Sequence, residues 1–269
     1  MKHVVYWISR ALRTIDNQAL YAAQQEALTR QEPLVLFFNL LPDFPNANTR
    51  NMDFLLNGLA EVSEKLKALN IPTIFMEGNA LTNLKTLNDQ YAISAIFTEH
   101  NPLRPIKQIH QNVSVWANTQ GIRFTRVNTA CVIPVWAASP KLEFSAKTIR
   151  NKIMSAYEPY LQISYPLFAH PVTSPIKSVF TKENAREILK NRAWPSLSLS
   201  ELLPGEDAAN KVLEEFINTK LDHYDRRNEV DSNGQSQLSA YLHFGMISPL
   251  KMIRDVKNTN HPNAPLFIE

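Results

Sequence analysis

Residues 34–40 read LVLFFNL and residues 49–69 read TRNMDFLLNGLAEVSEKLKAL, and these two runs decide the fold. The first run is short, almost wholly apolar and rich in aromatic and branched side chains, which is typical of a strand buried on both faces. The second run is amphipathic, because its apolar side chains recur every three or four residues. These side chains are Phe54, Leu55, Leu59, Val62, Leu66 and Leu69. A buried strand followed by an amphipathic helix predicts one βα unit.

The same alternation continues on both sides of this unit through the first half of the chain. We predict strands at residues 3–8, 34–40, 72–76, 95–98 and 123–127, and helices at residues 16–29, 49–69, 81–89 and 105–119. Strands that alternate with helices build parallel sheets, and the crossovers between them are right-handed. The sequence therefore predicts an α/β fold with a doubly wound, parallel five-stranded sheet. Ligands of such sheets bind beyond the carboxyl ends of the strands.

The chain of 269 residues is longer than one ordinary domain, and its composition divides it into three regions. Residues 1–130 form the α/β domain. Residues 131–180 form a linker that crosses between domains, since prolines are frequent from residue 134 to residue 204. Residues 181–269 are expected to form an all-helical domain. Its first helix is capped by Thr181 and runs to about residue 191, and its second runs from about residue 205 to residue 223 with a core stripe of Ala208, Val212, Phe216 and Leu221.

The composition restricts the class of protein. The net charge of +3 permits a nucleic-acid partner without requiring one. No apolar run is long enough to span a membrane, and residues 1–8 are more typical of a buried strand than of a signal peptide. The single cysteine, Cys131, excludes an internal disulfide and favours a cytoplasmic protein. Because no histidine is near it in the sequence, Cys131 is expected to be a small buried residue rather than a nucleophile.

Polar residues follow two of the predicted strands. Arg10 and Arg13 come after the first strand, where they could meet an anion at the sheet edge or pair with Asp16 on the surface. Glu99 and His100 follow the fourth strand. We interpret them as loop polar residues rather than a metal site, because neighbours on a strand point apart and no third ligand is close in sequence. This half has neither a Gly-x-Gly-x-x-Gly run nor a P-loop, so the two common nucleotide fingerprints are missing.

A cationic helix is predicted at residues 145–157, with Lys147, Arg150 and Lys152 exposed. Trp136 and Phe144 precede it in the linker. We expect these two aromatic side chains to be packing anchors where the linker crosses the first domain.

Residues 224–249 contain the most informative polar stretch. It begins with Tyr224 beside two arginines and passes through a polar turn at residues 231–234. A helix is predicted to begin at Gln235–Ser236, with an apolar side made of Leu238, Tyr241, Leu242 and Phe244. Gly245 should end this helix, and Ser248 followed by Pro249 should open the next one.

The start of that helix is a candidate phosphate site. Free backbone N–H groups at a helix start, together with the hydroxyls of Ser236 and Ser239, are suitable donors to a phosphate. The alternative is that Ser236 is only an N-cap and that the arginines belong to a solvated face. Local chemistry leaves both interpretations open.

Three separated segments resemble the DNA photolyases, especially the class II enzymes that act on cyclobutane pyrimidine dimers. They are the opening at residues 6–17, with its Tyr-Trp, two arginines and Asp-Asn, the Lys-x-Glu…Ala-x-Thr-x-Arg-x-Lys-Ile pattern at residues 141–153, and residues 224–245. The resemblance runs from residue 4 to the end of the chain.

This resemblance implies a function and a set of contacts. The helical domain of such enzymes binds FAD, and the reduced, light-excited flavin splits the dimer in ultraviolet-damaged DNA by electron transfer, so no catalytic side chain or metal is assigned. The α/β domain holds a second, light-harvesting chromophore where one is present. Carried over to this sequence, DNA phosphate would contact Arg227. The flavin and its phosphates would contact Tyr224, Gln235, Ser236, Gln237, Leu238 and Ser239.

The resemblance also implies a longer protein. Members of the family continue beyond the position of Glu269 with the flavin-ring pocket, the tryptophan relay and most DNA contacts, so we expect a C-terminally shortened chain here, and a monomer at full length. Three alternatives stay open. They are a flavin photoreceptor of the same family that does not repair DNA, a nucleotide-binding α/β protein without photochemistry, and an interaction fragment whose exposed helical face pairs with another chain.

Overall fold

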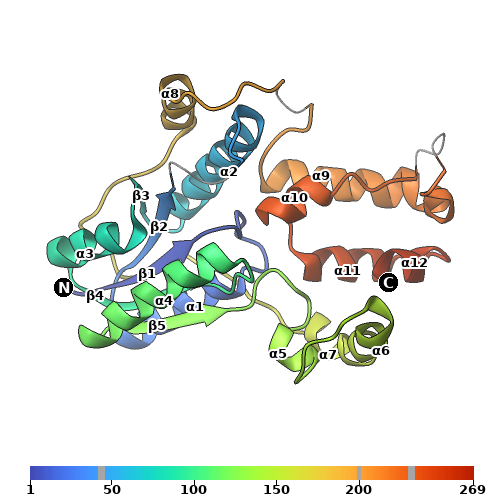
Figure 1. Ribbon diagram of the computed structural model, residues 1–269, viewed down its shortest axis with the longest axis horizontal. Helices are drawn as coiled ribbons and strands as arrows, with labels where there is room; N and C mark the ends of the chain where they lie inside the picture. Colours follow the sequence, from blue (N-terminus) through green and yellow to red (C-terminus); the bar gives the residue numbers. More distant parts are fainter. Residues whose placement is uncertain (42–45, 199–200, 230–233) are drawn as a thin grey trace.

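The computed structural model of the protein describes residues 1–41, 46–198, 201–229 and 234–269 (Figure 1). Within these residues the first half forms a five-stranded sheet whose strand pairs are all parallel. The strands are β1 (His3–Ile8), β2 (Leu34–Leu40), β3 (Thr73–Glu77), β4 (Ile93–Glu99) and β5 (Arg123–Val127), and their order is β3-β2-β1-β4-β5. The predicted fold class is confirmed, and each predicted strand overlaps an observed one.

Helices cover both faces of the sheet. They are α1 (Gln18–Arg30), α2 (Thr49–Ala68), α3 (Ala80–Tyr91) and α4 (Arg104–Thr119). One buried cluster joins α1 and α2 to the face that carries Tyr6, and a second joins α3 and α4 to the face that carries Trp7. β1 is buried at every position because both of its faces are covered, which explains its nearly continuous apolar sequence. The winding direction of the sheet changes between β1 and β4, so the switch point lies beside the carboxyl end of β1.

Asparagine residues cap the N-termini of the first three helices. Asn17, Asn48 and Asn79 are N-caps whose side chains accept hydrogen bonds from the backbone of the first turn. Helix α1 begins at Gln18, later than predicted, because Asp16 has a left-handed backbone and Asn17 serves as the cap.

Residues 131–180 contain three short helices, α5 (Val135–Ala138), α6 (Ala146–Ala156) and α7 (Glu158–Leu161). The predicted cationic helix is confirmed as α6, which begins after Ser145. The Ser145 hydroxyl accepts a hydrogen bond from the Thr148 N–H at 3.4 Å. Lys147 is exposed, whereas Lys152 is half-buried and pairs with Glu143.

Two predictions for the linker side chains are wrong. Trp136 is 58% exposed and Phe144 is 91% exposed, so neither is a packing anchor. The helices α5 and α6 pack mainly against each other and α7, and such short elements do not cover a large aromatic ring. Trp136 meets the edge of the His100 ring, with 5.8 Å between ring centroids. Cys131, expected to be buried, is exposed in the same stretch.

Helix α8 (Lys182–Asn191) packs against the α/β domain. Thr181 and Asn184 form the two halves of a capping box at its start, which confirms the predicted cap. The helix packs beside α2 (Figure 1). Just before it, the ring of Phe180 stacks on Phe75 of β3 with 4.7 Å between centroids.

The remaining elements are helical, as predicted. Helix α9 (Glu206–Glu215) continues through a π-helical turn (Phe216–Lys220) and a 3-10 turn (Leu221–Arg226), and α10 (Ser239–Phe244), α11 (Pro249–Asn258) and α12 (Ala264–Ile268) follow. They lie together on the side toward which the arrows of β1 and β5 point (Figure 1). None of the helices in the described ranges has the length and apolar character needed to span a bilayer.

The buried stripe of α9 and its continuation is rotated slightly from the prediction. Phe216 and Leu221 are buried as expected, whereas Ala208 and Val212 are only partly buried. The neighbouring residues Ala209 and Leu213 take the buried positions instead.

The loop after β1 contacts α10 directly. The Leu12 N–H donates to the Phe244 carbonyl at 3.3 Å, and the Arg13 guanidinium donates to the Gly245 carbonyl at 3.1 Å. Gly245 has a φ of +64° and ends α10 as predicted. A Cβ at this position would clash with the Arg10 carbonyl, so glycine is required both for the turn and for the close approach. This contact places the helical part of the chain at the carboxyl edge of the sheet.

Candidate functional site

The predicted phosphate segment is a loop that leads into α10. Helix α10 begins at Ser239, so the predicted start at Gln235–Ser236 is wrong. Gln237 has a left-handed φ of +58°, which interrupts a helix at this point. The Ser236 hydroxyl accepts a weak hydrogen bond of 3.5 Å from the Leu238 N–H, and α10 has no side-chain cap. Residues 231–233 of the turn predicted at residues 231–234 lie outside the described residues.

Three of the predicted site residues come together although eleven positions separate the first from the last. The Arg227 guanidinium lies 4.8 Å from the centroid of the Tyr224 ring, and its Nη1 donates to the Tyr224 carbonyl at 3.3 Å. The Gln235 side chain donates to the Arg227 carbonyl at 3.5 Å. The Tyr224 ring also meets Phe216 and, from α12, Phe267, with centroids 5.5 and 5.4 Å away. The ring therefore holds the cation in a defined position.

The other predicted site residues follow in the loop. Gln237 and Ser239 are exposed, and Ser236 is half-buried. The Leu238 side chain is buried in the main core, which leaves only its backbone for contact with a ligand. The first hydrogen bond of α10 runs from the Leu242 N–H to the Leu238 carbonyl, so the N–H groups before Leu242 have no helical acceptor.

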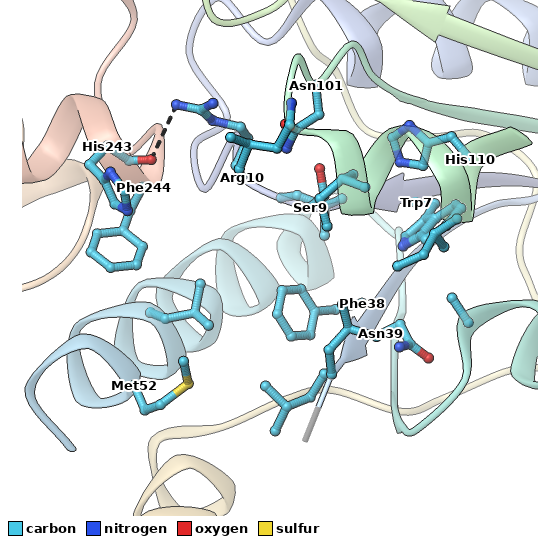
Figure 2. A pocket seen from close by; sticks show the side chains of 18 residues that line it. Trp7, Ser9, Arg10, Phe38, Asn39, Met52, Asn101, His110, His243 and Phe244 are labelled. Atoms are coloured by element: carbon cyan, nitrogen blue, oxygen red, sulfur yellow. Dashed lines mark hydrogen bonds between the residues drawn. The ribbon is translucent and has the colours of Figure 1, made fainter. Parts of the chain in front are cut away.

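A separate cavity of about 230 Å³ lies between the carboxyl edge of the sheet and α10 (Figure 2). Its apolar walls come from β1, β2, α2, α4 and α10. They include Trp7, Ile8, Phe38, Met52, Leu55, Ile106, Ile109 and Phe244. Figure 2 shows Trp7 and His110 on one side of the space and His243 and Phe244 on the opposite side.

Few polar groups face this cavity. The Arg10 guanidinium donates to the His243 carbonyl at 3.4 Å (Figure 2) and forms no ion pair among the described residues. Asn39 is engaged at both ends of its amide, with the Gly78 carbonyl and Asn83. His110 is 1% exposed, and its Nε2 has no hydrogen-bond partner among the residues that the structure describes.

Arg13 and Glu99 are structural residues near the same edge. Arg13 is buried and donates to backbone carbonyls, including that of Thr129 at 2.7 Å, while the Asp16 carboxylate pairs with Arg254. The Glu99 carboxylate accepts from the Tyr6 hydroxyl at 2.6 Å and from the N–H and hydroxyl of Ser9 at 2.9 and 2.7 Å. Burial and the Glu99 charge raise the pKa of Tyr6 well above its usual value, which keeps the phenol a hydrogen-bond donor.

The described residues contain no group of three or more histidine, cysteine and acidic side chains arranged to hold a metal ion. Arg13 donates to the backbone carbonyl of Asp16 at 3.1 Å and not to its carboxylate, so the ion pair considered from the sequence does not form among the described residues.

Sequence reasoning did not find the cavity. Its lining comes from strand ends and helices that are far apart in the chain, and their side chains are also typical of a core. One signal was present at His110, which falls on the apolar stripe of its helix with Ile106, Val113 and Ala117. An imidazole on such a stripe has to find a polar partner or remain unsatisfied.

The amino-acid sequence of the chain matches the sequence model of a known protein family. The model described as DNA photolyase matches residues 4–173, which is more than half of the chain. The chain belongs to the DNA photolyase family. The match includes all of the sheet except His3, the first residue of β1, and most of the linker.

Named relatives extend the match over nearly the whole chain. A deoxyribodipyrimidine photo-lyase of Arabidopsis thaliana is 31% identical over 99% of this chain and 56% of its own length. One from Potorous tridactylus is 32% identical over 94% of this chain and 48% of its own length. The chain thus spans about half the length of the curated relatives it matches.

Solved structures of low sequence identity share the fold. The photolyase of Sulfolobus tokodaii, described as having two FAD molecules that imply a novel light-harvesting cofactor, has a TM-score of 0.75 at 17% identity over 96% of this chain and 55% of its own. A cryptochrome of Synechocystis has a TM-score of 0.79 at 16% identity over 100% of this chain and 59% of its own.

Proposed function

We propose that the chain acts in light-dependent DNA repair, as part of a deoxyribodipyrimidine photolyase of the class II type that binds FAD. The observation that carries the proposal is the grouping of Tyr224, Arg227 and Gln235 next to the Ser236–Ser239 loop in a member of the DNA photolyase family. The chain spans about half the length of its relatives. We therefore propose the complete repair reaction only for a full-length protein of which this chain is a part. To Tyr224, Arg227, Gln235 and the Ser236–Ser239 segment we assign only the binding of flavin and DNA.

The loop has donors suited to the flavin phosphates. The hydroxyls of Ser236 and Ser239 and the side-chain amide of Gln237 are at least partly open to solvent, and none of the described carboxylates hydrogen-bonds to them. N–H groups at the start of α10 add further donors. Neutral donors without a competing carboxylate favour a phosphate ligand.

When bound, reduced FAD supplies the photoexcited electron, and the chain binds and orients it. Gln235, Ser236 and Ser239 would hold the phosphates. Tyr224 would keep the Arg227 guanidinium in place, so that it can contact a phosphate of damaged DNA. Such a contact positions the duplex and carries no sequence information.

A blue-light repair assay tests this proposal. The purified protein with reduced FAD is mixed with an oligonucleotide that contains one cyclobutane thymine dimer, and dimer loss is followed in light and in the dark. We expect dimer loss only in light. If FAD binds and no light-dependent dimer loss occurs, the repair function is wrong, and the related flavin photoreceptor becomes the better interpretation. The 27% identity of this chain to a cryptochrome-1 of Arabidopsis thaliana, over 94% of this chain, supports that second candidate.

We also propose that the cavity beside β1 binds a second, light-harvesting chromophore. The cavity lies at the switch point of the sheet, where ligands of doubly wound folds bind. Its aromatic walls suit a planar ring, and Arg10 offers a cation without a carboxylate partner among the described residues.

A further inference from the structure

His110, which lines the cavity, has a ring nitrogen without a hydrogen-bond partner among the described residues. Its side chain is 1% exposed, and no described residue bonds to its Nε2. Buried polar atoms in folded proteins almost always have a partner, because leaving one unpaired destabilises the fold. The Nε2 atom of His110 therefore needs a partner, and because the residue belongs to the cavity lining, we consider a ligand of the cavity as that partner.

The His110 ring is held rigidly and without charge. It meets the Trp7 ring edge to face with 5.0 Å between centroids, and the Phe124 ring at 6.3 Å. Burial lowers the pKa of His110 to about 4, and the nearby charges of Arg126 and His100 act in the same direction. At neutral pH the imidazole can make a hydrogen bond without bringing a charge into the cavity.

Asn101 adds a second unused polar group on this side. Its side chain is buried, and its Oδ1 accepts a hydrogen bond from the Leu103 N–H at 3.0 Å. None of the described residues accepts a hydrogen bond from its Nδ2. Phe38 and Met52 lie on another part of the lining, where the neighbouring polar residue Asn39 has both ends of its amide engaged (Figure 2). The lining thus combines available hydrogen-bonding groups at His110 and Asn101 with apolar side chains elsewhere.

We propose that His110, assisted by Asn101, selects the ligand of this cavity by hydrogen-bonding the polar edge of a planar, uncharged aromatic heterocycle. The inference rests on the proposed chromophore site and names the residues that give it specificity. A volume of about 230 Å³ is below the ~300–1,000 Å³ of pockets that bury drug-sized ligands. We therefore expect a single ring system to fill the cavity, with a charged substituent beside Arg10 on its lining. The competing explanation is that His110 only fills space between Trp7 and Phe124.

Binding of riboflavin 5′-phosphate (FMN) to the 269-residue chain tests the inference. We compare the wild type with His110→Phe, which keeps an aromatic ring and removes the polar atom, and with His110→Gln, which restores a hydrogen-bonding group. We expect His110→Phe to weaken FMN binding about tenfold and His110→Gln to recover part of the loss. Without ligand, His110→Phe should raise the unfolding temperature, because it removes an unpaired buried nitrogen.

Two control variants locate the bound FMN. His100→Phe makes the same chemical change on a ring outside the cavity lining and should bind like the wild type. Leu55→Trp places a large side chain in the cavity and should abolish the binding there. FMN that binds Leu55→Trp as well as wild type does not occupy the cavity.

The outcomes separate the two proposals. Equal FMN affinity of wild type and His110→Phe, with binding lost in Leu55→Trp, would overturn the role of His110 and leave the chromophore site intact. Absence of FMN binding in the cavity of the wild type would overturn both. If His110→Phe fails to fold, His110→Gln and an Asn101→Leu variant decide between a polar and a packing role.

Discussion

Glu206 is a buried carboxylate that joins the two halves of the molecule. Its oxygens accept hydrogen bonds from the N–H groups of Thr14 and Ile15 at 2.9 and 2.7 Å, and from Lys65 at 3.0 Å. Burial alone would lower the pKa of Lys65, but its hydrogen bonds to Asp207, Glu206 and Glu61 raise the pKa above the usual value. The N-terminus of α9 is thereby tied to the loop after β1 and to α2.

We expect Glu206→Gln to lower the free energy of unfolding by about 2–4 kcal/mol, because an amide cannot accept all of these hydrogen bonds and leaves buried donors unpaired. Urea denaturation of the purified protein measures this loss. Asp207→Asn is the matched control, since Asp207 is exposed and its pairing with Lys65 contributes under about 1 kcal/mol. Equal effects of the two variants would contradict the assigned role of Glu206.

His110 should make stability depend on pH. The unfolded histidine titrates near about 6.5, whereas the folded residue has a pKa of about 4 because burial lowers it. Between these values the unfolded chain binds a proton that the folded chain does not, so stability falls as the pH falls. From pH 7.5 to pH 5 this linkage removes about 2 kcal/mol. Urea denaturation of His110→Phe at both pH values should show a loss smaller by that amount, and equal losses would show that His110 does not titrate in this way.

Arg227 is the residue-level test of DNA contact. We expect Arg227→Ala to weaken binding to damaged DNA about equally for all sequences and to reduce the slope of log affinity against log salt by about one. Fluorescence anisotropy at several salt concentrations measures both. Lys85→Ala, an exposed change on α3, should leave the slope as it is. A slope that Arg227→Ala does not alter would remove Arg227 from the DNA contact.

At the scale of elements, α10 is the piece that joins the candidate sites. Its N-terminal end follows the Ser236–Ser239 loop, Phe244 lines the cavity near its C-terminal end, and Gly245 packs on the loop after β1. A displacement of this helix would alter both places at once.

We expect Gly245→Ala to destabilise the protein by more than about 2 kcal/mol, since the new Cβ would clash with the Arg10 backbone in addition to the strain at positive φ. Gly121→Ala is a close control. Gly121 has a similar φ of +67° and open space around it, so only the conformational strain of about 1 kcal/mol is expected. Thermal unfolding of both variants measures the difference, and equal shifts would show that the contact at Gly245 is loose.

The sequence predicted the elements whose side chains repeat with a clear period. β1 and β2 are continuous apolar runs, and α2 has a regular apolar stripe, so local chemistry determines them. The start of α10 could not be predicted because it depends on the left-handed backbone of Gln237 and on burial of Leu238 against distant helices. Trp136 and Phe144 were misplaced for the same kind of reason, since hydrophobicity alone does not say which elements come close enough to cover a ring.

The candidate site was predictable in part. The grouping of Tyr224 with Arg227 follows from their spacing of three residues, but the approach of Gln235 requires the chain to fold back. The cavity forms only in the tertiary structure, because α10, which lines one side of it, is more than two hundred residues from β1 in the sequence. Sequence patterns report local periodicity and carry little information about such contacts.

At the scale of the whole molecule, the α/β sheet and the helical part meet at the carboxyl edge of the sheet. The cavity lies at this junction and is lined by Phe244 of α10, whereas the segment that carries Ser236 and Ser239 is at the other end of this helix. The proposed flavin segment and the proposed chromophore cavity are thus at opposite ends of the short helix α10.

The central claim is that the loop before α10 binds the phosphates of FAD. Titration of FAD into the 269-residue chain, followed by calorimetry, tests it most directly when wild type is compared with the Ser236→Ala/Ser239→Ala double variant. The account predicts saturable binding to the wild type and an affinity lower by at least about tenfold in the variant, because two donors to phosphate are removed. Equal affinities, or no binding to the wild type, would contradict it.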